Sequence, residues 1–269
     1  MHYKLFKCFI LVMIIPAMLV GGCQSDKGKR KPGLLDDSET TAIVDRIETI
    51  KRVYHLSPSP AEMLSVIDVS DLSFDVGLLN PITNQDNYLD TKSQTIGLGI
   101  YITDLAYAAL FGRHEETLDY LDVVRTMAEQ IRVTGAIDDE LIENARNNVE
   151  YLDSLFDISN EAFINMLFFC ERNDRPNTVV LLSAGAFIES LFLAVNLAGD
   201  NGQTDYIMQH LADQKYALDN LVMFAESMQD QDPNVAAVME DIKPIKEIYD
   251  NIAVVAGTTT VETDEAADN

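Results

Sequence analysis

Apolar residues recur along this chain every three to four positions, the spacing of amphipathic α-helices. Ile43, Ile47 and Ile50, for example, fall on one helical face. No segment shows a convincing β-strand alternation, so the pattern predicts an all-α domain, a bundle or short solenoid of about eight or nine helices. The predicted helices cover residues 36–56, 60–67, 87–111, 115–133, 138–156, 159–172, 178–198, 204–228 and 233–255.

Residues with capping preferences mark several of the predicted helix ends. Ser59-Pro60-Ala61-Glu62 is a capping box with proline at the first helical position. Gly112 and Gly135 are placed to end two helices. Residues 69–86 lack a helical period, so we expect a loop there that packs through apolar side chains. Those side chains are Phe74, Leu78, Leu79 and Ile82.

The segment 178–198 is apolar on every side, which fits either the central helix of a bundle or a membrane span. Glu189 lies near its centre, where a carboxylate costs several kcal/mol in lipid. We therefore expect a core helix.

Two segments resemble each other at a constant offset, since Gly185 follows Gly99 by 86 residues. Residues 98–108 match 184–194, and residues 119–121 match 205–207 without a gap. This pattern suggests duplicated αα-hairpins, although shared helical composition also explains it. In either case the small residues in both helices would let the two backbones approach closely, because glycine inside a helix costs about 1 kcal/mol relative to alanine.

The first residues have the features of a secretory signal: Lys4 and Lys7, then a short apolar run, then small residues. The ending Leu19-Val20-Gly21-Gly22-Cys23 resembles the lipobox of bacterial lipoproteins. That resemblance implies cleavage after Gly22, a thioether-linked diacylglycerol on Cys23, and an acyl chain such as palmitate on the new amino group. The alternative is an ordinary signal peptide (residues 1–22) with an incidental cysteine.

Residues 23–34 would then be a lipidated flexible tether that is mostly basic, and its cations rest on anionic headgroups or are simply solvated. By Gram-negative sorting rules, Gln24 after the cysteine favours the outer membrane. Surface-displayed lipoproteins of the Bacteroidetes type carry an acidic run here, so the basic tether favours the periplasmic face. Residues 35–256 would form one helical domain, and 257–269 a disordered acidic tail.

Composition narrows the classes of partner. The chain has 269 residues and a formal charge of −25, so nucleic acid is an unfavourable partner. Cys8 lies in the predicted signal and Cys23 at the lipid site, which leaves Cys170 as a buried structural thiol and no intramolecular disulfide in the domain.

Three stretches, residues 79–81, 97–107 and 186–192, resemble motifs of a group of helical lipoproteins of the Bacteroidetes. The resemblance covers roughly residues 75–225. It implies a lipoprotein with an all-α fold, and it implies no catalytic residue, because the group has no established activity.

Asp104 and Glu189 occupy nearly equivalent positions in the two similar helices, each among apolar neighbours. Buried carboxylates are rare unless they are paired or bound. We expect Tyr101, Tyr107 and Thr103 to hydrogen-bond them. The pair is either a structural polar network or a pocket for a small ligand or metal.

No signature of a hydrolase, phosphate-binding loop or metal site occurs in the sequence, and the histidines His55, His114 and His210 lack metal-ligand spacing. The leading hypothesis is a non-enzymatic lipoprotein that binds an envelope protein or a small ligand, with no cofactor besides its covalent lipid. The alternative is a metal- or cofactor-dependent helical bundle that uses the buried carboxylates.

Overall fold

The structure is a computed structural model that describes residues 59–252, apart from 66, 70, 71, 134, 136, 138, 148–151 and 199–203. Contacts along the chain divide it into two units, Met1–Thr40 and Thr41–Asn269, and the described residues all belong to the second. The predictions for the signal, Cys23, the tether, the first helix and the acidic tail lie outside the described residues.

The described residues form nine α-helices and two short 3-10 helices, with no β-strand among them, so the all-α prediction is confirmed. The α-helices are α2 (Pro60–Leu64), α3 (Thr91–Leu110), α4 (His114–Gln130), α5 (Asp139–Asn147), α6 (Leu152–Arg172), α7 (Pro176–Ala198), α8 (Thr204–Asp213), α9 (Lys215–Glu226) and α10 (Pro233–Asp250). The 3-10 helices are η1 (Val76–Leu78) and η2 (Ile82–Asn87).

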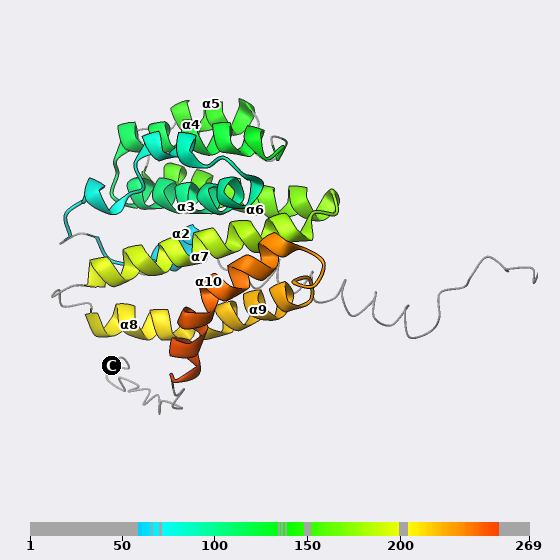
Figure 1. Cartoon of the computed structure of the whole chain (residues 1–269). Helices are drawn as coiled ribbons and strands as arrows, with labels where there is room; N and C mark the ends of the chain where they lie inside the picture. The colour runs from blue at the N-terminus through cyan, green and yellow to red at the C-terminus, as the bar shows by residue number, and fades with distance from the viewer. Residues whose placement is uncertain are drawn as a thin grey trace, which may run out of the picture. The chain divides into compact units, whose positions relative to one another are not determined.

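Helices α3 and α7 form the centre of the bundle (Figure 1). Helix α3 packs against α4 and α6, while α7 packs against α8, α9 and α10. The short α2 contacts α3, α6 and α7. In the view of Figure 1, α4 and α5 therefore lie above the central pair, and α8 and α9 lie below it.

Capping chemistry explains why several helices begin and end where they do. The Ser59 hydroxyl accepts from the Glu62 N–H at 3.1 Å, and the Glu62 carboxylate accepts from the Ser59 N–H at 2.9 Å. Asp90 and Ser93 form a second such box at the start of α3, four residues later than the predicted start. Gly112 follows α3 with φ of 65°, a conformation that glycine adopts without steric cost.

The structure corrects three of the sequence-based predictions of local structure. The break predicted between 156 and 159 is absent, because α6 runs continuously from Leu152 to Arg172. The predicted helix 204–228 is two helices, α8 and α9, which meet at Gln214. In the 69–86 loop, Phe74, Leu78 and Leu79 pack on the core as expected, whereas Ile82 is 37% exposed.

The central helices touch backbone to backbone, as the small residues predicted. A Cβ atom added at Gly99 would lie 2.2 Å from the Leu182 carbonyl oxygen, and one added at Gly185 would lie 2.2 Å from the Ile96 carbonyl oxygen. Thr103 Oγ1 donates across the same contact to the carbonyl oxygen of Ala186 at 3.3 Å. Gly99 contacts Leu182, and Thr103, four residues further along α3, contacts Ala186, which is four residues further along α7. The two helices therefore run in the same direction.

These contacts have an internal twofold correspondence. Gly185 follows Gly99 by 86 residues, and Leu182 follows Ile96 by the same number. Gly99 lies against Leu182, and Gly185 lies against Ile96, which is the equivalent of Leu182 in the other half. This reciprocal pattern is the one that a twofold axis between two equivalent helices produces, and it supports the duplicated αα-hairpins α3–α4 and α7–α8.

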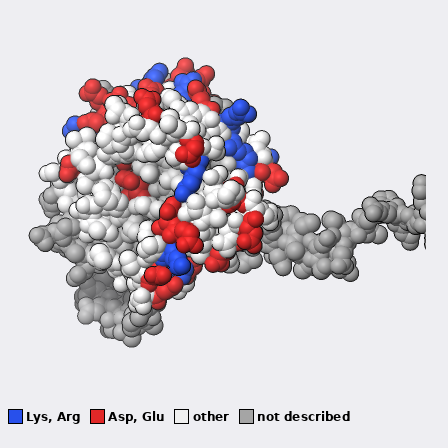
Figure 2. Space-filling model, in the orientation of Figure 1, with Lys and Arg blue, Asp and Glu red and all other residues white. Residues whose placement is uncertain are grey.

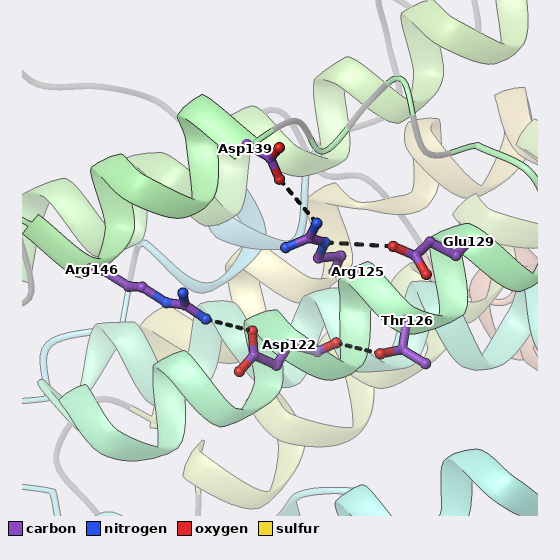
Figure 3. Close-up of polar contacts among 6 residues, drawn as sticks. All are labelled: Asp122, Arg125, Thr126, Glu129, Asp139 and Arg146. Atoms are coloured by element: carbon purple, nitrogen blue, oxygen red, sulfur yellow. Dashed lines mark hydrogen bonds and ion pairs between the residues drawn. The ribbon is translucent and has the colours of Figure 1, made fainter.

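The outer pair α4 and α5 is joined by surface ion pairs (Figure 3). Arg125 on α4 lies 3.0 Å from Asp139 on α5, and Arg146 on α5 lies 3.3 Å from Asp122 on α4. A further pair, Arg125 with Glu129 at 3.6 Å, lies within α4. Because these side chains are largely exposed, each pair contributes at most about 1 kcal/mol. Helix α5 is therefore held in place mainly by its buried apolar face, which consists of Leu141, Ile142 and Ala145.

Candidate functional site

The close approach of α3 and α7 brings Asp104 and Glu189 together. Asp104 lies just over one turn beyond Gly99 on α3, and Glu189 lies one turn beyond Gly185 on α7. Because the helices run in the same direction, the two carboxyl groups meet and lie within hydrogen-bonding reach of each other. The sequence prediction that these two residues form a pair is therefore supported by the geometry.

Asp104 is fully buried, with an exposed fraction of 0%. Its Oδ2 accepts a hydrogen bond from the Asn80 N–H at 3.2 Å, while its Oδ1 receives none from any described donor. Burial is the main cause that raises the pKa of Asp104 well above its usual range, and the neighbouring Glu189 raises it further. Burial and the neighbouring carboxyl therefore both favour the protonated form of Asp104.

Glu189 is only partly buried and connects the pair to the protein surface. Burial raises the pKa of Glu189 to about 7, although the hydrogen bond from Asp104 acts in the opposite direction. No lysine or arginine among the described residues contributes to the electrostatics of either carboxyl. The pair therefore shares a proton and has no internal counter-ion in the described part of the chain.

Tyr101 and Tyr107 are buried in the core, but the prediction that they hydrogen-bond the carboxyls is wrong. The Tyr101 hydroxyl donates to the Pro81 carbonyl oxygen at 2.8 Å, and the Tyr107 hydroxyl accepts from the Asp75 N–H at 3.1 Å. Burial raises the pKa of both phenols. Through these hydrogen bonds both tyrosines hold the preceding loop against α3.

Thr103 was also expected to contact the carboxyls and does not. Its hydroxyl bonds to the carbonyl oxygens of Gly99, at 3.0 Å, and of Ala186. A threonine inside a helix commonly bonds to the carbonyl one turn earlier. Thr103 therefore stabilises the contact between α3 and α7.

Asn80 is a residue of the site that the sequence did not indicate, and so is Tyr120, whose pKa is raised by burial and by the nearby Asp104 and Glu189. The Asn80 N–H donates to Asp104, and its carbonyl oxygen accepts from the Tyr120 hydroxyl at 2.9 Å. Its side-chain amide donates to the Tyr88 hydroxyl at 2.9 Å and accepts from Asn84 at 2.8 Å. Its backbone groups thus tie the loop between η1 and η2 to α3 and α4, and its side chain ties the same loop to η2 and the residue that follows it. The only signal in the sequence was the turn-forming dipeptide Asn80-Pro81.

Two other features of the described residues bear on chemistry. No group of three or more His, Cys, Asp or Glu side chains within residues 59–252 is placed to hold a metal ion. Cys170 is fully buried, and burial raises the pKa of its thiol to about 11. An unreactive structural thiol follows from that burial.

Helix α7, which carries Glu189, is the one described helix long and apolar enough to cross a membrane. However, 72% of its most apolar window is buried inside the bundle, so we interpret it as the core helix that the sequence predicted.

Comparison of the chain with models of protein families, with curated proteins and with solved structures finds no match.

Proposed function

We propose that the protein is a lipid-anchored, non-enzymatic binding module of the cell envelope of a Gram-negative bacterium. In this proposal it is attached through Cys23 to the periplasmic face of the outer membrane, and its partner is an envelope protein or a small ligand. The observation that carries the proposal is Leu19-Val20-Gly21-Gly22-Cys23 after a short apolar run. Two or more acyl chains at one cysteine suffice for stable anchoring.

The described domain supplies features suited to binding. Its central helices are fixed by the backbone contact at Gly99 and Gly185, so side chains on them are held in position. Glu189 presents a carboxyl group from this rigid pair to the surface. The formal charge of −25 favours cationic over phosphate-bearing partners.

Replacing Cys23 by serine should abolish lipid attachment, because the thioether needs a thiol. The Cys23→Ser variant should remain an uncleaved precursor and should not incorporate a fatty-acid analogue during metabolic labelling. Cys8→Ser, which leaves the predicted attachment site intact, is the matched control and should be labelled like the wild type. Equal labelling of wild type and Cys23→Ser would refute the anchor and the location inferred from it.

The adjacency of Asp104 and Glu189 favours one second candidate, a metal- or cofactor-dependent helical protein that uses these carboxyls. Elemental analysis of the purified full chain separates the two candidates. The binding-module proposal expects no stoichiometric transition metal. A stoichiometric metal in the wild type that is lost in Glu189→Gln would establish the second candidate instead.

A further inference from the structure

We draw no further inference here: the strongest candidate, the surface patch of the exposed side chains Phe192 and Val195 near the end of α7, a part of the bundle where Figure 2 shows mostly uncharged side chains, carries no proposal, because nothing in the described part of the chain shows what covers it.

Discussion

Adding one methyl group at Gly99 or Gly185 should destabilise the folded domain by about 3 kcal/mol or more. A Cβ atom at either position would lie 2.2 Å from a carbonyl oxygen of the opposite helix. Because the obstacle is backbone, relief requires α3 and α7 to move apart rather than a side chain to rotate. For a domain of this size, the melting temperatures of Gly99→Ala and Gly185→Ala should fall by roughly 10 °C, measured by circular dichroism.

Gly97 provides the matched control on the same helix. Its added Cβ would meet side-chain atoms, the Tyr88 ring at 2.9 Å and Met127 Cε at 3.0 Å. Those groups can shift, and alanine gains about 1 kcal/mol of helix propensity over glycine. Gly97→Ala should therefore change stability by no more than about 1 kcal/mol. Equal losses at Gly97 and Gly99 would show that the backbone contact is not the cause.

The second large effect is a loss of stability with rising pH that depends on the carboxyl pair. Burial raises the pKa of Glu189 from 4.5 to about 7, and it raises that of Asp104 well above 3.8. Between these values the folded state holds protons that the unfolded chain has released, so the free energy of unfolding decreases as pH increases. The stabilisation is complete below about pH 4 and is lost through pH 7 and above.

Chemical denaturation at pH 5 and pH 8 measures this effect. The wild type should lose on the order of 2 kcal/mol more than Glu189→Gln over that range. The comparison with Glu189→Gln matters, because general repulsion in so acidic a chain acts on both proteins alike. Parallel pH profiles for the two proteins would show that the pair does not share a proton.

Variants of Asp104 separate the roles of hydrogen bonding and charge. Asp104→Asn keeps an acceptor for the Asn80 N–H, so it should flatten the pH profile at little cost near neutral pH. Asp104→Ala removes that acceptor and should cost about 1–3 kcal/mol. Asp104→Ala combined with Glu189→Ala should cost less than the sum of the two single changes, because the residues act as one unit. Small, strictly additive losses would contradict the pair.

Much of the central packing was predictable from composition. Glycine is unfavourable inside a helix unless a neighbour needs the space, so Gly99 and Gly185 marked the place where two backbones meet. The carboxyls were predictable for a related reason, since Asp104 and Glu189 are the only acids in otherwise apolar stretches of these two helices. In both cases a residue type that is unfavourable in its local sequence is explained by a tertiary contact.

The rest was not predictable because its signal lies elsewhere in the chain. Asn80 acts through backbone groups that reach Asp104 and Tyr120, which are 24 and 40 residues away, and any residue with an N–H and a carbonyl presents the same groups. The hydroxyls of Tyr101 and Tyr107 bond to Pro81 and Asp75, so their partners depend on the path of that loop. The break at Gln214 lacks a glycine or proline, and the apolar period continues across it.

The reciprocal contact between α3 and α7 is nearly symmetric, but the buried charges beside it are not. When the two halves are aligned at their offset of 86 residues, Asp104 corresponds to Ser190, and Glu189 corresponds to Thr103. In a dimer of identical subunits every buried group occurs twice, so one acidic pair would require a second across the axis. A single chain is free of this constraint, since its two halves diverge independently. Because the halves are joined in one chain, one side of the axis can carry the acidic pair while the equivalent positions on the other side carry the two neutral hydroxyls of Ser190 and Thr103. Identical subunits do not permit this asymmetry.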